Sequence, residues 1–175
     1  MRLFKYEGYN LTISEEAFAL KVFRQIWNRD RSQSKEKAIM ELGFIYFMED
    51  VRSDYQFIID PEERAKSIKE GEGLKESWVP DALVKEGMKL YASFKTTSAL
   101  LLEDTRALIN NYRLKLRSLD FDELDVKSTK VLGDIIQSIP KMVKDLDEAE
   151  RALAKEMAQD EKVRGVQEKA MFEDL

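Results

Sequence analysis

The sequence predicts a mostly α-helical protein, an elongated helical bundle with a long antiparallel helix pair and extended N- and C-terminal arms. Apolar residues recur at three- and four-residue steps over most of residues 14–157, which is the spacing of one helix face. No Gly or Pro interrupts the chain between Gly87 and Leu116. The polar loop SLDFDELD separates two long apolar stripes. We expect an N-terminal arm or short strand at 1–13, a helical domain at 14–157 and a C-terminal tail at 158–175.

Composition excludes several classes of function. Charged residues make up 36% of the 175-residue chain, with the two signs interspersed and a net charge of −5, whereas a general polyanion binder needs a basic field. The chain has no cysteine and no histidine, so it lacks thiolate chemistry and the commonest general base and metal ligand. We expect a non-enzymatic protein without cofactor or metal. No segment reads as a secretory signal or membrane span, which favours a protein kept, or assembled, in the cytoplasm.

Residues 1–13 alternate loosely between apolar and polar and are expected to form an arm, a strand or a hairpin. Because a lone strand cannot satisfy its backbone, it pairs either within its own fold or with a neighbouring subunit. Lys5, Tyr6 and Tyr9 give the basic and aromatic mixture of nucleic-acid stacking surfaces. Without a surrounding basic cluster, a packed or partner-facing arm is the better interpretation.

Two helices are predicted next. Ser14 is the candidate N-cap of the first, with Glu15 and Glu16 in its first turn, and its apolar spacing extends to about Asn28. The second, at about 35–49, is apolar on nearly all faces, so it is buried in the core or against a partner. Ser32 and Ser34 are candidate caps in the polar connection between them.

A charged island at residues 49–54 interrupts the apolar stretch FIYFMEDVRSDYQFIID. Its carboxylates match no calcium-loop spacing, and Arg52 lies among them as a counterion. We expect Arg52 to close a turn against Asp50 or Asp54 through charge-assisted hydrogen bonds. That pair serves either the local fold or a subunit junction.

Asp60, Pro61 and Glu63 give the clearest local signal, an N-cap followed by Pro at the first helical position and Glu three residues after the cap. A short helix follows to about Glu70 and ends at Gly71 and Gly73. The GEGL sequence lacks the Lys-Ser/Thr ending of a phosphate loop and is interpreted as a turn.

The two long stripes predict a coiled-coil-like pair. The first helix is either continuous to about Leu116 or broken near residues 96–98. Its stripe consists of Val84, Met88, Tyr91, Phe94, Ser98, Leu101, Thr105, Leu108 and Tyr112. The second stripe consists of Leu132, Ile136, Ile139, Val143, Leu146, Ala149, Leu153 and Met157. Pro140 is expected to bend or restart that helix, and the tail after Ala158 to fray unless residues such as Phe172 dock on a partner.

The block at residues 36–81 resembles a family of virion structural proteins of tailed bacteriophages, including the crAss-like phages. The shared features are an IYFM-type helix end at 45–48, an R-S-D-Y turn at 52–55, an Asp-led ERxxxI helix at 60–68, a GL turn at 73–74, and W-x-P-D at Trp78, Pro80 and Asp81. The family's turn often carries a Pro before R-S-D-Y, where this chain has Val51.

The resemblance implies a subunit of a symmetric ring at the portal vertex, a head-completion or adaptor protein that joins capsid to tail in the virion. Its partners would be its own copies and the portal and tail proteins of the same particle, with at most non-specific proximity to packaged DNA. We expect interfaces to involve Tyr6, Tyr9, Asp50, Arg52, Asp54, Tyr55, Trp78 and Phe172. The alternatives are a capsid-associated or internal virion protein, or a soluble helical binding module.

Overall fold

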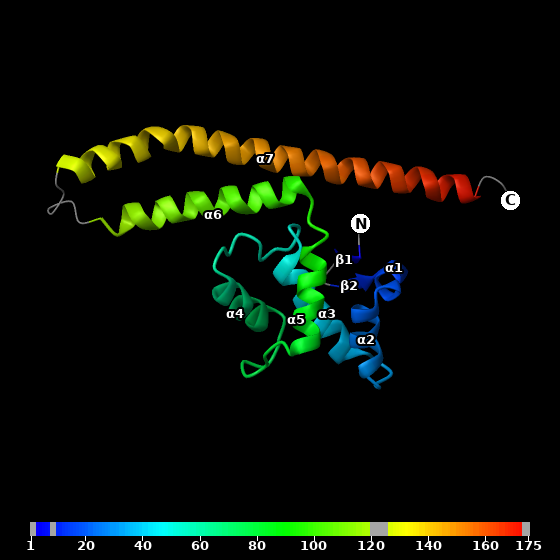
Figure 1. Ribbon diagram of the computed structural model, residues 1–175. Helices are drawn as coiled ribbons and strands as arrows, with labels where there is room; N and C mark the ends of the chain where they lie inside the picture. Colours follow the sequence, from blue (N-terminus) through cyan, green and yellow to red (C-terminus); the bar gives the residue numbers. More distant parts are fainter. Residues whose placement is uncertain (1–2, 8–9, 120–125, 173–175) are drawn as a thin grey trace. The chain divides into compact units, whose positions relative to one another are not determined.

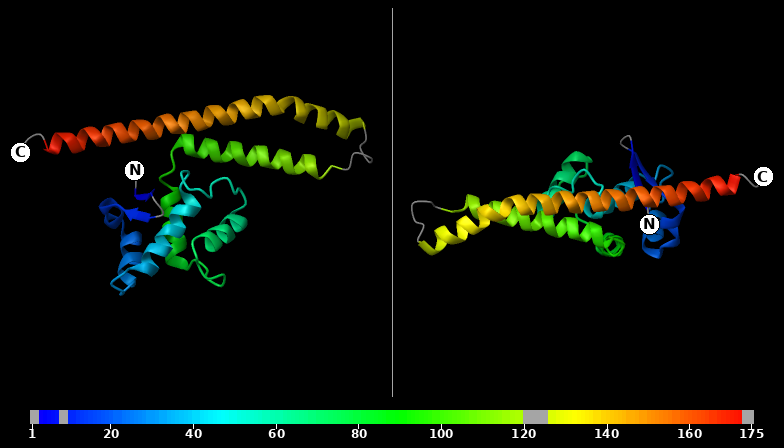
Figure 2. Two further views of the ribbon diagram at one scale, coloured as in Figure 1. Left: turned by 180° about the vertical axis from the view of Figure 1, so that it is seen from behind. Right: turned by 90° about the horizontal axis from the view of Figure 1, so that it is seen from above.

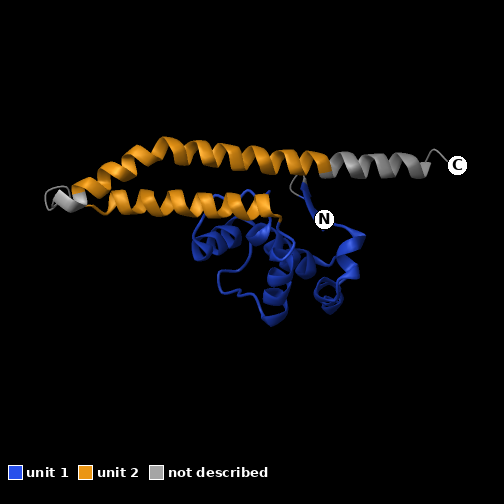
Figure 3. Ribbon diagram, turned by 45° about the horizontal axis from the view of Figure 1, so that its top comes forward, with its two compact units in different colours: residues 1–95 blue, residues 96–175 orange. Residues whose placement is uncertain are grey.

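The computed structural model describes the backbone of residues 3–7, 10–119 and 126–172, and the side chains of 3–6, 10–119 and 129–159. These residues form seven α-helices and one two-stranded sheet (Figure 1), which confirms the mostly α class. The chain divides into two compact units, Met1–Lys95 and Thr96–Leu175 (Figure 3). The division lies inside the segment 14–157 that the sequence groups as one helical domain.

Unit 1 begins with a β-hairpin that packs into its core. Strands β1 (Phe4–Glu7) and β2 (Asn10–Ile13) pair antiparallel, with Tyr6 opposite Leu11. The Ser14 amide donates to the Leu3 carbonyl at 3.0 Å. Phe4 is buried, and its ring stacks on Tyr91 at a centroid distance of 5.2 Å. The predicted arm therefore pairs within its own fold.

The first predicted helix is two helices, α1 (Glu15–Ala19) and α2 (Lys21–Arg29). Leu20 interrupts the helix between them, because its φ of −83° and ψ of 120° are extended rather than helical. Ser14 takes the N-cap position without a side-chain cap hydrogen bond. The sequence did not reveal this break, since Leu20 is apolar and a spacing pattern is insensitive to a single extended residue.

Helix α3 (Glu36–Glu49) forms the centre of unit 1, and residues 41–48 are all buried. This confirms the prediction of a helix buried on nearly all sides. Its N-cap is Lys35, in the left-handed conformation at φ 55°, rather than either candidate serine. Ser32 contributes nonetheless, because its hydroxyl oxygen accepts from the Lys35 amide at 3.1 Å.

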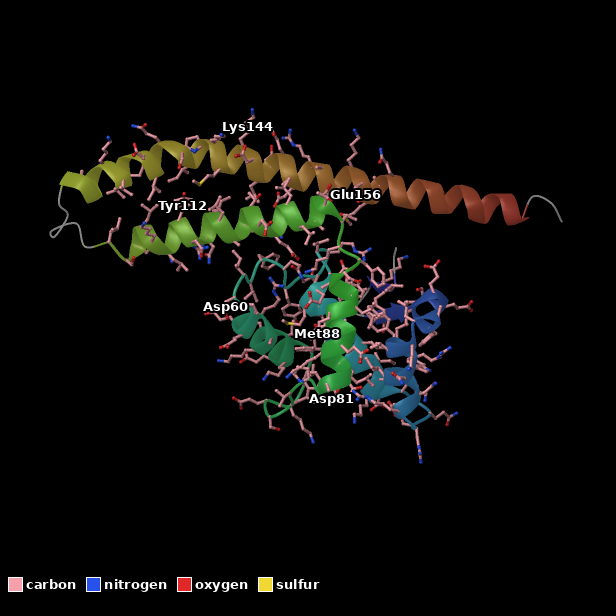
Figure 4. The ribbon with its side chains drawn as sticks, in the orientation of Figure 1. Asp60, Asp81, Met88, Tyr112, Lys144 and Glu156 are labelled. Carbon is pink, nitrogen blue, oxygen red and sulfur yellow. The ribbon has the colours of Figure 1, made fainter. Side chains whose placement is uncertain are left out.

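Helix α4 (Pro61–Gly71) begins as predicted. The Asp60 carboxylate accepts from the amides of Glu62 (2.9 Å) and Glu63 (2.8 Å), and Figure 4 marks Asp60 at the start of the helix. Gly73, at φ 68°, takes the left-handed conformation in the turn that follows. Helix α5 (Ala82–Ala92) starts at a second Asp cap, where Asp81 accepts from the Val84 amide at 3.0 Å.

Unit 2 is an antiparallel helical hairpin made of α6 (Thr97–Arg117) and α7 (Val126–Phe172), which run side by side in every view (Figures 1 and 2). The Thr96 hydroxyl, whose oxygen also caps α6, donates to Glu156 at 3.1 Å. Arg106 bonds to Glu150 at 3.0 Å. Figure 4 shows Lys144 on the outer side of α7. The long antiparallel pair is thus confirmed.

The predicted long helix breaks, in line with the second alternative for that segment: α5 ends at Ala92 and α6 begins at Thr97. The break resets the helical phase, so part of the predicted stripe is wrong. Leu101 and Leu108 are exposed, whereas Ala99 and Leu102 are buried.

The α7 stripe is right at its ends and wrong in its middle. Leu132, Ala149 and Leu153 are buried as predicted, but Ile136, Ile139 and Val143 are exposed. Helix α7 contains Pro140 without restarting there, and it curves in its N-terminal part (Figures 1 and 2). It also continues to Phe172, where the sequence favours a frayed tail from Ala158.

Candidate functional site

The charged island forms a closed corner at the end of α3. Asp50 is buried, and its carboxylate accepts from the Arg52 guanidinium, with Nε to Oδ1 at 2.7 Å, and from the Arg52 amide at 2.9 Å. The Tyr91 hydroxyl of α5 donates to the other carboxylate oxygen. Of the two predicted partners, Arg52 takes Asp50, and it does so within its own fold.

The same loop satisfies the carbonyls at the C-terminal end of α3. The Ser53 hydroxyl donates to the Phe47 carbonyl at 2.9 Å. The Met48 carbonyl accepts from the Arg64 guanidinium of α4 at 2.9 Å and from the side-chain Nε2 of Gln56 at 3.3 Å. Carbonyls at a helix end have no intrahelical partner and are costly to bury unsatisfied. The polar residues after α3 therefore let an apolar helix end inside the core.

Electrostatics fix the protonation of this corner. Burial raises the pKa of the Asp50 carboxyl, but the hydrogen bonds and charge of Arg52 and the Tyr91 hydroxyl outweigh it, so that pKa lies below its ordinary value. Burial and the neighbouring Asp50 charge raise the pKa of Tyr91 well above its usual range. Asp50 is thus ionised and Tyr91 protonated at neutral pH, which suits a fixed structural contact rather than proton transfer.

Three predicted interface residues meet around a second feature, a cavity of about 270 Å³ between the β-hairpin, α3 and the turn after α4. Tyr6 lines it directly. Tyr55 donates to Glu72, a lining residue, at 2.8 Å. Trp78 packs edge-on against Phe44, another lining residue, at 4.8 Å. The remaining lining residues are Leu11, Glu36, Ile39, Met40, Gly43, Phe47 and Leu74.

The other predicted interface residues lie elsewhere. Asp50 and Arg52 point into the corner with Tyr91, and Asp54 is exposed and takes no part in that network. Tyr9 and the side chain of Phe172 lie outside the described residues. Of the predicted set, Asp50 and Arg52 therefore form the corner, Tyr6 lines the cavity, and Tyr55 and Trp78 contact lining residues. The role of the set as an interface stays a prediction.

The described residues contain no cluster of three acidic side chains arranged to hold a metal ion. No helix among them combines the length and hydropathy needed to cross a bilayer.

The most distinctive surface is on unit 2. Eight of the twelve exposed large hydrophobic side chains among the described residues lie on α6 and α7. They are Leu100, Leu101, Leu108, Leu114, Val131, Ile136, Ile139 and Val143. Scattered exposed apolar residues are normal, but a concentration on one element marks an interaction surface. The α6–α7 hairpin is therefore the strongest candidate for a functional surface.

Sequence reasoning assigned most of these residues to the core of the helix pair. The sequence does carry a signal of this exposure, namely the doubled or tripled apolar positions, where apolar residues follow one another directly. They are Leu100–Leu102, Ile135–Ile136 and Met142–Val143. Adjacent residues point about 100° apart on a helix of 3.6 residues per turn, so a single partner helix cannot cover both. Such doubling predicts an apolar face wider than a two-helix contact.

Comparisons of this chain with protein-family models, curated proteins and solved structures found no match.

Proposed function

We propose that this chain is a non-enzymatic structural subunit that works by protein–protein association through its α6–α7 hairpin. The observation that carries the proposal is the set of half-exposed leucine, isoleucine and valine side chains on two packed helices. A two-helix unit buries little apolar surface by itself, and apolar faces of this kind are covered in bundles by further helices. The fixed protonation of the Asp50 corner also favours a structural role.

The particle is proposed from the sequence resemblance of residues 36–81. On that basis the chain is a subunit of a tailed-phage virion, placed in a ring at the portal vertex that connects capsid to tail. A ring uses heterologous contacts, in which one surface of a subunit meets a different surface of the next. The hairpin and the cavity that Tyr6 lines offer two such different surfaces.

Electron microscopy of the particle tests this placement. The expected result is a ring density at the neck whose subunits each fit the seven helices of the described residues. The reference specimen is a particle whose copy of this chain carries an epitope fused before Met1, detected with a bound antibody fragment. Antibody label on the shell or inside the capsid would show that the chain is a capsid-associated or internal virion protein instead. Absence of the chain from particles would refute the virion proposal.

A further inference from the structure

We infer that the hairpin's apolar face binds a second copy of this chain, with the two hairpins antiparallel about a two-fold axis. This inference takes the association role from the proposed function and names the partner and its orientation. It does not depend on the particle in which the chain works.

The geometry of the hairpin divides its exposed apolar residues between two sides. In each helix, the residues that pack on the other helix form a contact line, and the residue directly after a contact residue lies to one side of that line. In an antiparallel pair these following residues lie on the same side of the hairpin in both helices, because the two chains turn in opposite senses when viewed along one axis. Leu100 follows the buried Ala99, and Leu114 lies two seven-residue repeats further along the same line. Ile136 follows the buried Ile135, and Val143 continues that line.

The hairpin face consists of Leu100, Leu114, Ile136 and Val143, which are 47–57% exposed. Ile139, 38% exposed, borders it on the contact line, seven residues after the buried Leu132. Leu101, Leu108 and Val131 precede the contact positions by one and lie on the other side. The hairpin face holds more apolar residues than the other side, and four of the residues named above, Leu114, Ile136, Ile139 and Val143, lie within four residues of Asn110 on α6 or of Pro140 on α7. An isologous two-fold contact needs such a self-complementary patch on or near its axis.

Charge is segregated along the hairpin. The loop half, residues 107–144, carries seven basic residues, Arg113, Lys115, Arg117, Lys127, Lys130, Lys141 and Lys144, against five acidic residues, Asp134 and, in the loop, Asp120, Asp122, Glu123 and Asp125. The open half, residues 96–106 with 145–159, carries three basic residues against the acidic residues Glu103, Asp104, Asp145, Asp147, Glu148, Glu150 and Glu156. The halves therefore have net charges of +2 and −4.

This polarity selects the orientation. A parallel pair would place the basic halves together, and like charges facing each other destabilise a contact. A two-fold axis at the level of Asn110 and Pro140 instead places the 113–117 segment of one copy beside the 103–107 segment of the other. On α7, the same axis brings residues near 133 of one copy beside residues near 147 of the other. Apolar burial and charge complementarity thus favour the same arrangement.

The orientation restricts how a ring could use the pair. A two-fold contact joins subunits of opposite polarity, whereas neighbours in one cyclic ring have the same polarity. In a ring assembly, the hairpin face would join subunits of two rings stacked face to face. The other side of the hairpin, with Leu101, Leu108 and Val131, would remain for the heterologous contact within each ring.

Sedimentation velocity of the full chain tests whether the pair forms. We expect a species of twice the 20.4 kDa chain mass that dissociates more readily as salt rises. Val143→Glu places a charge in the contact and should weaken dimerisation by at least about 100-fold. Leu108→Glu is the matched control, since Leu108 is 49% and Val143 57% exposed on opposite sides of the hairpin, and it should leave the dimer intact. A monomeric chain, or equal effects of the two substitutions, would overturn the inference.

Cysteine cross-linking tests the orientation, because the natural chain has no cysteine. A Cβ at Gly133 meets nothing within 4 Å, and the Asp147 side chain is 52% exposed, so Gly133→Cys and Asp147→Cys should both fold. A mixture of the two variants should cross-link with a short bismaleimide, while each variant alone should not. Cross-linking of each variant to itself would show a parallel pair and refute the orientation.

The outcomes separate the two proposals. A neck ring built from a chain that is monomeric in solution would retain the proposed function and refute the inference. A dimer in solution, together with no density for this chain at the neck, would retain the inference and refute the proposed place in the neck ring.

Discussion

Removing the Tyr91 hydroxyl gives the sharpest test of the role assigned to the Asp50 corner. Tyr91→Phe keeps the ring that stacks on Phe4 and packs against Phe23, so it opens no cavity. It removes one buried hydrogen bond to an ionised carboxylate, a contact worth about 1.5–3 kcal/mol. Asp50 stays paired with Arg52, so no buried charge is left alone. We expect unit 1 to lose stability within that range.

Urea unfolding followed by tryptophan fluorescence measures this effect. Both tryptophans, Trp27 and Trp78, lie in unit 1, so the signal reports that unit even if unit 2 unfolds separately. The midpoint should fall with little change in slope.

Tyr55→Phe is the matched control. It removes a tyrosine hydrogen bond to the exposed Glu72 carboxylate, where solvent screening keeps the loss below about 1 kcal/mol. If Tyr91→Phe cost no more than Tyr55→Phe, or cost as much in an Asp50→Ala background, which has no acceptor for the Tyr91 hydroxyl, as in the natural chain, the assigned contact between Tyr91 and Asp50 would be wrong.

Three further expectations concern unit 1. Asp60→Ala removes the acceptor for two α4 amides and should cost about 0.5–2 kcal/mol by the same urea assay, whereas Asp54→Ala, at an exposed site, should change stability little. Gly87→Ala places a Cβ 2.7 Å from buried Ile45 and should destabilise by about 1–3 kcal/mol through overpacking, while Gly43→Ala meets only ordinary contacts at 3.7 Å and should be neutral or stabilising; equal effects would contradict the packing described. Hydrogen bonds from the Ser32 hydroxyl and the Ser32 and Ala38 amides lower the pKa of Asp30 from 3.8 to about 2, so its stabilising contribution is complete above about pH 4 and is lost as pH falls towards 2. Asp30→Asn should therefore lower the thermal midpoint at pH 7 but not near pH 2, and a difference that persisted near pH 2 would exclude that linkage.

Local signals in the sequence predicted the elements that local chemistry determines. The Asp60 cap with Pro61 located the start of α4, and the apolar positions around α3 predicted its burial. The pairing of Arg52 was narrowed to two carboxylates, of which the structure selects Asp50. Tyr91, which completes that corner, lies 41 residues away, and a contact over such a distance leaves no mark in local spacing.

The predicted stripes on α6 and α7 are wrong where two alternative helix faces are equally apolar. Ile135 and Ile136 lie three and four residues after Leu132, so either one continues an apolar stripe from Leu132, and tertiary packing buries only Ile135. The break before α6 shifted the stripe by one residue, so that Leu102 replaced Leu101 in the contact. Apolar spacing reports how much helix surface avoids water, but it does not say whether the same chain or another copy covers it.

The stacking of Phe4 on Tyr91 has a consequence for synthesis. These two residues lie near opposite ends of the sequence of unit 1. The core therefore stays incomplete until almost the whole of Met1–Lys95 has left the ribosome. The nascent β-hairpin and α3 would expose apolar surface during that interval, a period of aggregation risk and chaperone demand. The α6–α7 hairpin forms from neighbouring segments and can close soon after α7 emerges. A ribosome stall shortly before Tyr91 would therefore leave unit 1 protease-sensitive, whereas a stall well beyond Lys95 would leave it protected.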